Sequence, residues 1–237
     1  MPTTKQRRET ARRRLERQIQ RRQEAAAARK RRNLVAAAGL GVVVVIDPGI
    51  EATGPLEDLL DRHRLHPVAV LLTHGHIDHT YSVVPVCEAR DVPAWIHPDD
   101  RGQLTDPLHW LGTPLLGMTS LPTAEPADLR ELADGETLEL AGLRLGVRHA
   151  PGHTLGSVVF TAETADEPLL FSGDLLFAGS IGRTDLPGGS YPTILDSLAR
   201  VVLPLDDATV VLPGHGPGTT VGRERSTNPY LQLAGQP

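Results

Sequence analysis

Several features that would point to other classes of protein are missing from this sequence of 237 residues. It contains one cysteine, Cys87, which excludes an internal disulfide, argues against a cysteine-based zinc finger and fits a reducing, cytoplasmic location. Cys87 lies in an apolar run, so we expect a buried thiol rather than a nucleophile. The Gly-x-Ser-x-Gly pattern of serine hydrolases is also absent.

A membrane-spanning segment is not predicted either. The apolar run at residues 34–46 has thirteen residues, whereas a helix that crosses a bilayer needs about twenty. Asp47 and Pro48 end this run, and its last five residues, Val42 to Ile46, are expected to form a strand.

Charge is distributed unevenly along the chain. Residues 1–32 carry thirteen Lys and Arg and three Glu, a net charge of +10, which leaves −5 − 10 = −15 for the remainder. We expect this basic arm to be a solvated helix or disordered. It has no interleaved aromatic residues for base stacking, so nucleic acid is not an expected partner. Weak contact of residues 5–32 with an anionic membrane surface stays open as an alternative.

Four side chains suited to binding a metal ion stand within six residues: His74, His76, Asp78 and His79. They follow the apolar run 68–72, which is typical of a buried strand, and should therefore lie at the edge of a sheet. Imidazole nitrogens and carboxylate oxygens are ligands of zinc and similar divalent ions. The first two histidines can converge from an extended loop, and the other two residues can reach a second ion.

Three further ligand-type side chains stand where an apolar run gives way to Gly and Pro. Glycine allows the backbone to approach a metal closely, and the turn fixes the direction of the side chain. These residues are His153 in Pro151-Gly152-His153-Thr154, Asp174 in Ser172-Gly173-Asp174, and His215 in Pro213-Gly214-His215-Gly216-Pro217.

In this order, HxHxDH, PGHT, SGD and PGHGP resemble the motifs of the metallo-β-lactamase superfamily of dinuclear metallohydrolases. Within it, the short glyoxalase II-like (hydroxyacylglutathione hydrolase-like) proteins are most similar. The resemblance covers roughly residues 42–233 and includes Asp47-Pro48-Gly49, the segment 182–189 and the tail 222–229. It implies an α/β (α+β) fold, an αββα sandwich of two mixed β-sheets with helices outside, formed by residues 41–237.

The resemblance also implies roles for individual residues. His74, His76 and His153 would bind a first ion, Asp78, His79 and His215 would bind a second, and Asp174 would bridge both. Two divalent ions are expected, with zinc favoured and iron or manganese as alternatives. A hydroxide held between the metals would attack the substrate carbonyl. Asp78 and Asp174 are counted as catalytic because they would bind these metals. Arg183 and Asp185 are candidates for substrate binding, with a purely structural ion pair as the equal alternative.

The expected activity is hydrolysis of a small-molecule hydroxyacyl thioester. One alternative is a persulfide dioxygenase of the same superfamily, with a single iron on His74, His153 and Asp174. Another is a non-catalytic metal-binding domain tethered by the basic arm. The chain stops soon after Tyr230, without the helical domain with which longer relatives hold glutathione, so the thiol could differ from glutathione.

Residues 1–40 depart from the pattern of the superfamily. Relatives usually have two strands before the one at Val42 to Ile46, whereas residues 1–40 of this chain are the basic arm and a short apolar segment, which we expect to be helical or disordered. Residues 1–40 resemble the start of a membrane-anchored cyclophilin-type prolyl isomerase. A fusion, an in-frame deletion or a gene-model artefact would explain the junction, and the sheet edge would then be left uncovered.

The remaining polar residues are given supporting roles. We expect His63 and His66 at the surface and His97 at a helix start. His109 belongs to a lid at residues 101–130 whose apolar side chains, such as Trp110, contact substrate or pack on the domain. Possible orienting residues for the ligands are Thr73, Thr154 and His149, the last with packing as its alternative.

Overall fold

The structure is a computed structural model that describes residues 36–38, 41–111 and 124–236. The chain divides into two units, residues 1–33 and 34–237. The predictions for the basic arm and for part of the lid lie outside the described residues. The second unit contains all the elements that follow.

The first sheet has five strands in the order β1-β2-β3-β4-β5. Strands β2 to β5 run parallel to one another, and β1 pairs antiparallel with β2. The strands are β1 (Ala36–Ala38), β2 (Val42–Ile46), β3 (His66–Leu71), β4 (Ala94–Ile96) and β5 (Leu129–Glu131). Strand β1 lies in the segment expected to be helical or disordered, and it pairs with the edge of β2 that was expected to be uncovered.

The second sheet has six strands in the order β13-β12-β9-β8-β7-β6. Only the β9–β12 pair of this described sheet is parallel, so both sheets are mixed, as predicted. The strands are β6 (Thr137–Leu140), β7 (Leu143–His149), β8 (Val158–Glu163), β9 (Pro168–Gly173), β12 (Val210–Pro213) and β13 (Thr219–Thr220). A separate two-stranded ribbon consists of β10 (Leu176–Phe177) and β11 (Ser180–Ile181).

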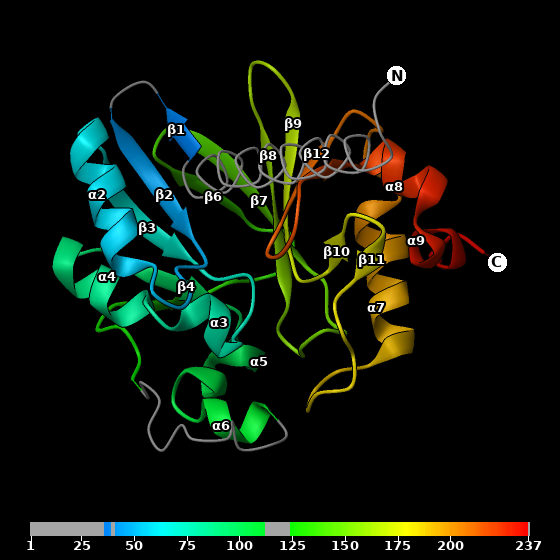
Figure 1. Cartoon of the computed structure of the whole chain (residues 1–237), viewed down its shortest axis with the longest axis horizontal. Helices are drawn as coiled ribbons and strands as arrows, with labels where there is room; N and C mark the ends of the chain where they lie inside the picture. The colour runs from blue at the N-terminus through cyan, green and yellow to red at the C-terminus, as the bar shows by residue number, and fades with distance from the viewer. Residues whose placement is uncertain (1–35, 39–40, 112–123, 237) are drawn as a thin grey trace, which may run out of the picture. The chain divides into compact units, whose positions relative to one another are not determined.

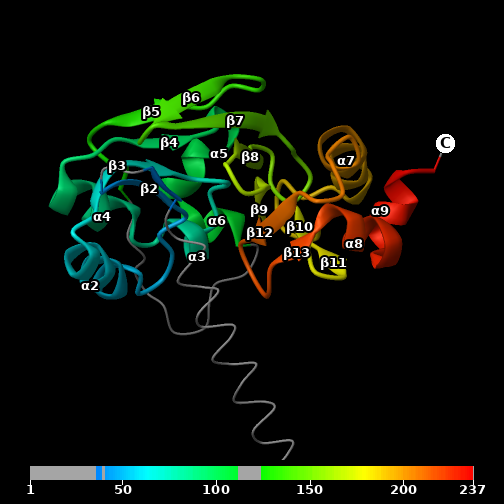
Figure 2. The ribbon, with the colours of Figure 1, turned by 90° about the horizontal axis from the view of Figure 1, so that it is seen from above.

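Helices cover the outer face of each sheet, as Figures 1 and 2 show. On the first sheet these are α2 (Thr53–His63) and α4 (Val83–Arg90). On the second they are α7 (Tyr191–Ser197), which continues as the π-helical turn η2 (Leu198–Val202), α8 (Val221–Thr227) and α9 (Pro229–Ala234). Among the described residues, no helix has the length and apolar character needed to cross a membrane.

The hydrophobic core has three layers, which follow from alternation along the strands. In β7, Leu145 and Val147 face the first sheet and are buried, whereas Arg144 and Arg148 point outward. The central layer between the sheets includes Leu71 and Phe160, and the two outer layers lie between each sheet and its helices. The predicted αββα sandwich is therefore confirmed.

One edge of the sandwich collects the ends of several strands. Strand β3 leads there into residues 73–79, and β7, β9 and β12 lead into the turns that carry the other three candidate ligands. The backbone N–H of Val158, at the start of β8, donates to the carbonyl of Thr73 at 2.8 Å and joins the two sheets at this edge. The short helices α3 (Ile77–Thr80), α5 (Pro98–Arg101), η1 (Gly102–Leu104) and α6 (Pro107–Trp110) follow the ends of β3 and β4.

Candidate metal centre

Three buried imidazoles form the first part of the site. His74, His76 and His153 have potential ligand atoms within 4.8 Å of one another, and all three side chains are almost inaccessible to water. The Nε2 atom of each is buried and has no hydrogen-bond partner among the described residues. Buried polar atoms without a partner are rare in folded proteins, so three that converge on one point fit the binding of a cation.

Neighbouring groups fix which nitrogen of each ring can bind a metal. Thr73 Oγ1 lies 2.6 Å from Asp47 Oδ2 and donates its only proton there, so it accepts from His74 Nδ1 at 3.0 Å. His153 Nδ1 donates to the carbonyl oxygen of Arg183 at 2.8 Å. In both rings the Nε2 lone pair is therefore left facing the other histidines, as metal ligation requires.

A second group lies beside the first and consists of Asp78, His79 and His215. His215 Nε2 lies 3.0 Å from Asp78 Oδ2 and 3.2 Å from His79 Nε2. His79 Nδ1 lies 3.0 Å from Asp47 Oδ2, so Asp47 orients His79 directly and His74 through Thr73. Asp78 and His79 belong to the short helix α3, which precedes α4.

Asp174 lies between the two groups. Its Oδ1 is 3.4 Å from His79 Nε2, and its Oδ2 is 3.6 Å from both His153 Nε2 and His215 Nε2. Gly214 leaves room for this arrangement, because a Cβ there would collide with Asp174 Oδ1 and the ring of His79. The seven residues predicted as ligands thus lie together in one cluster.

The electrostatics of the cluster suit metal binding. Burial, with repulsion from neighbouring histidines, lowers the pKa of His74 well below its usual value and that of His76 to about 4. Burial likewise lowers the pKa of His153. These rings are therefore neutral near pH 7 and offer the lone pairs that a metal needs.

The carboxylates of the cluster are ionised. Burial alone would raise the pKa of Asp78, but the hydrogen bond with His215 and the charge of His79 outweigh it and hold the pKa well below its usual value. Burial alone would also raise the pKa of Asp174, but the hydrogen bond with His79 and the charge of that ring lower it. Burial would lower the pKa of His79, but its hydrogen bonds with Asp174 and Asp47 raise it, and the hydrogen bond with Asp78 raises the pKa of His215. A cation that binds this second group would therefore displace their protons, and two carboxylates with five imidazoles form a donor set of the kind that divalent cations prefer.

Asp100 is a residue that the sequence interpretation missed. It is fully buried at the start of α5, just beyond β4. Its Oδ2 accepts from Gly75 N at 2.9 Å and Thr154 Oγ1 at 2.6 Å, and its Oδ1 accepts from Gly156 N at 2.7 Å. The carboxylate thereby ties the loop of His74 and His76 to the loop of His153.

The other predicted residues have mostly structural positions. His63 and His66 are exposed, and His97 caps α5 by accepting from the backbone of Asp99. Arg183 and Asp185 form an exposed bidentate ion pair at 2.7 and 2.8 Å. In the described part of the lid, His109 and Trp110 end the short helix α6.

His149 stacks on His97 with ring centres 4.2 Å apart and an angle of 4° between the rings. With Asp99 these residues form another group of potential metal ligands. The parallel rings do not direct two lone pairs at one point, and His149 Nε2 is engaged with the carbonyl of Leu155 at 2.8 Å. A packing role for His149 therefore fits the geometry better than metal binding.

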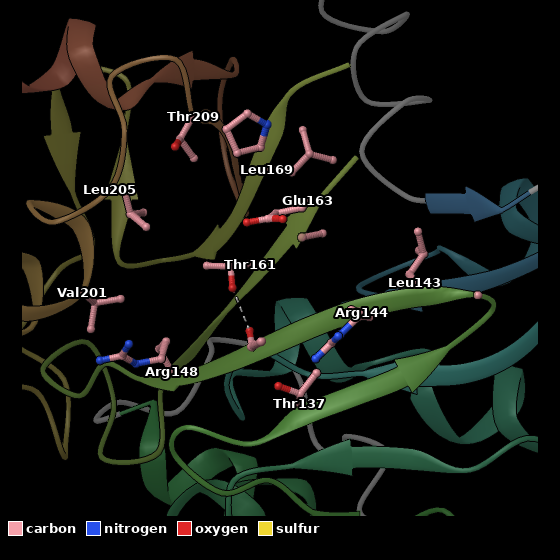
Figure 3. A pocket seen from close by; sticks show the side chains of 14 residues that line it. Thr137, Leu143, Arg144, Arg148, Thr161, Glu163, Leu169, Val201, Leu205 and Thr209 are labelled. Carbon is pink, nitrogen blue, oxygen red and sulfur yellow. Dashed lines mark hydrogen bonds between the residues drawn. The ribbon is translucent and has the colours of Figure 1, made fainter. Parts of the chain in front are cut away.

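A groove of about 700 Å³ lies elsewhere, on the outer face of the second sheet (Figure 3). It is lined by outward-facing residues of β7 and β8, such as Arg144, Arg148 and Thr161, together with Val201 and Leu205. None of the seven clustered His and Asp residues lines it. The chemistry of the candidate metal centre is therefore separate from this groove.

The fold and the site together define a metal-dependent hydrolase of the αββα sandwich class. The chain belongs to the metallo-beta-lactamase superfamily, whose profile matches residues 34–215. It is 34% identical to the hydroxyacylglutathione hydrolase GloC of Haemophilus influenzae over 187 residues, which cover 79% of this chain and 86% of that protein.

Two solved structures are also similar. One is entitled BLEG-1 B3 metallo-beta-lactamase and has a TM-score of 0.76 and 39% identity, covering 83% of this chain and 92% of that one. The other is TTHA1623 in a di-iron-bound form, with a TM-score of 0.68 and 41% identity, covering 79% and 89%. Members of this superfamily bind divalent metals, and the donor set of this chain fits such ions.

Proposed function

We propose that this protein is a dinuclear metallohydrolase that cleaves a hydroxyacyl thioester. The observation that carries the proposal is the convergence of two ligand groups with Asp174 between them. Similarity to a protein named hydroxyacylglutathione hydrolase supports the substrate class. A small-molecule substrate and a cytoplasmic location belong to the same proposal.

The chain's own residues would have distinct tasks in this reaction. His74, His76 and His153 would hold one divalent ion, and Asp78, His79 and His215 would hold the other, with zinc favoured over iron or manganese. Such ions lower the pKa of bound water to about 7 and polarise a carbonyl oxygen. Asp174 would contact both ions and fix their separation.

The two sides of the cluster differ in access to water. The side chains of Asp78 and His215 are 42% and 54% exposed, whereas those of His79 and His153 are nearly buried. Substrate would therefore approach from the side of Asp78 and His215. Asp47, behind His79, keeps that ring oriented with its Nε2 toward the cluster.

A mononuclear persulfide dioxygenase is the main alternative within the superfamily. It would need only His74, His153 and Asp174 and would leave the second group without a task. Because Asp78, His79 and His215 converge as closely as the first group, the geometry favours two ions. A non-catalytic metal-binding domain tethered by the arm would use the same ligands, and thioester turnover by the metal-loaded protein distinguishes it from the hydrolase.

The test is metal content per chain together with thioester turnover in the same purified sample. We expect two metal ions per chain and turnover, and we expect Asp174→Ala to lose both metal and activity. Asp166→Asn, an exposed change in the turn between β8 and β9, is the matched control and should change neither. One iron with oxygen uptake on a persulfide, or hydrolysis of a β-lactam but of no thioester, would refute the proposal.

A further inference from the structure

The residues around the candidate metal centre contain very few cations. We define the site loops as the segments that carry the candidate ligands or contact those that do. Lysine occurs only at positions 5 and 30 of the chain, and the site loops contain two arginines, Arg101 and Arg183. The site loops are residues 47–52, 73–82, 97–111, 150–157, 172–191 and 213–218.

Both of these arginines are already paired. Arg183 Nε and Nη2 lie 2.7 and 2.8 Å from the two carboxylate oxygens of Asp185. Arg101 Nε and Nη2 lie 2.9 and 2.7 Å from those of Glu125. The hydrogen bonds with Arg183 hold the pKa of Asp185 at about 2, so this partner remains ionised at any physiological pH.

This pairing matters for the thiol half of a substrate. Glutathione carries two carboxylates, and proteins take up carboxylates mainly through the fork of Arg or the ammonium of Lys. If the Arg183 pair opened toward a ligand carboxylate, Asp185 would remain beside it and repel that carboxylate. The site loops therefore offer an anionic thiol no uncompensated cationic side chain of Lys or Arg.

Apolar surface is present at the same place. Leu155, two residues after His153, is 48% exposed. Its side chain and the ring of Trp110 meet over Gly188, where an added Cβ would lie 3.3 Å from Leu155 Cγ and 3.4 Å from Trp110 Cζ3. The ligand loop, helix α6 and the loop after Arg183 thus share an apolar contact beside the metal centre.

We propose that the thioesters hydrolysed here have an uncharged thiol half, and that the Arg183–Asp185 pair disfavours anionic thiols such as glutathione. This inference rests on the thioesterase function proposed above. The thiol half would lie on Leu155 and Trp110 rather than in a cationic pocket. Asp185 acts as a specificity determinant by neutralising the one arginine on the loop after Asp174.

Two esters of the same hydroxyacid test this inference: lactoyl-glutathione and the uncharged lactoyl N-acetylcysteamine. With the metal-loaded full chain, we expect kcat/KM to be at least about tenfold higher for the uncharged ester. Asp185→Asn, which leaves Arg183 free, should shift the ratio of the two kcat/KM values at least about fivefold toward the glutathione ester. The metal-free variant should also bind S-methylglutathione more tightly than the metal-free wild type, by calorimetry.

Asp128→Asn is the matched control. Asp128 forms the same exposed bidentate pair with Arg130 at 3.0 and 2.7 Å, but it precedes β5 and lies outside the site loops. This variant should keep the wild-type ratio. A preference of the wild type for lactoyl-glutathione, or an unchanged ratio in Asp185→Asn, would overturn the inference alone. Failure to cleave either ester with metal bound would refute the thioesterase proposal as well.

Discussion

Replacing Asp100 by Asn tests whether one buried carboxylate holds the metal-ligand loops together. The carboxylate accepts from Gly75 N and Thr154 Oγ1 through one oxygen and from Gly156 N through the other. An amide keeps the shape of the side chain but has only one acceptor oxygen. Whichever way the amide turns, at least one buried donor then faces an NH₂ group and loses its partner.

The expected loss of stability follows from this count. A buried donor left without a partner costs about 1–3 kcal/mol, so Asp100→Asn should lower the free energy of unfolding by about that amount. Asp100→Ala leaves three donors without this acceptor. It also removes a carboxylate whose burial raises its pKa, so the losses are partly offset and we expect about 3–5 kcal/mol.

Replacing Asp100 by Asn should also weaken metal binding. Gly75 stands between His74 and His76, and Thr154 follows His153, so loosening both loops should weaken the first ion's affinity roughly 10–100-fold. Urea unfolding of the metal-free protein measures stability, and chelator competition measures affinity. Asp99→Asn is the control, because its carboxylate is 56% exposed and should change stability by less than about 0.5 kcal/mol. If the Asp100→Asn variant matched this control in both measurements, the tie between the loops would be refuted.

Three further predictions concern other parts of the molecule. Asp47→Asn removes one of the acceptors for Thr73 and His79, so metal affinity by chelator competition should fall roughly 10–100-fold, and wild-type affinity would contradict this. Burial raises the pKa of Cys87 to about 12, so at pH 8 a disulfide reagent should react at least about 100-fold more slowly than in urea, and equal rates would show an accessible thiol. Burial lowers the pKa of His76 to about 4, below its unfolded value of about 6.5. As the pH falls, the unfolded state is therefore protonated before the folded state. Between pH 6.5 and 4 this residue should lower the stability of the metal-free protein by about 3 kcal/mol. In the His76→Gln variant, the free energy of unfolding, measured in urea at several pH values, should fall less steeply with decreasing pH. An unchanged pH dependence would contradict the assignment of this loss to His76.

The candidate ligands could be found from the sequence because their signal is local. His74, His76, His153, Asp174 and His215 each stand shortly after an apolar strand and next to a glycine, and Asp78 and His79 follow in the same short motif as the first two. A short window therefore contains both the ligand and the turn that directs it. The supporting roles of Asp47 and Asp100 could not be inferred from such a window, because their partners are distant: Thr73 is 26 residues from Asp47, and Gly156 is 56 residues from Asp100. Both aspartates follow parallel strands of the first sheet, β2 and β4, at the edge where the ligands collect, and this placement was the available clue.

The larger elements of the fold were also predictable, because alternating or continuous apolar runs mark their strands. The shorter elements depend on contacts made by distant residues. The loop between β10 and β11 is held by Glu224, which accepts from Gly179 N at 2.7 Å, and by Asn228, which donates to the carbonyl of Ser180 at 3.0 Å. No pattern within residues 176–181 indicates these contacts. The π-helical turn that continues α7 likewise has no marker in its own sequence.

The division of the ligands between the two sheets links metal binding to the packing of the sandwich. Residues 74–79 follow β3 of the first sheet, whereas His153, Asp174 and His215 follow strands of the second. Each ligand group therefore contains residues from both sheets, and an ion in either group would join them. Asp100 makes the same connection without a metal, because it follows β4 of the first sheet and binds the loop after β7 of the second. The Asp100 carboxylate and the ions thus stabilise the same arrangement of the two sheets. This role gives a physical reason for burying the Asp100 carboxylate despite the large desolvation cost of a buried charge.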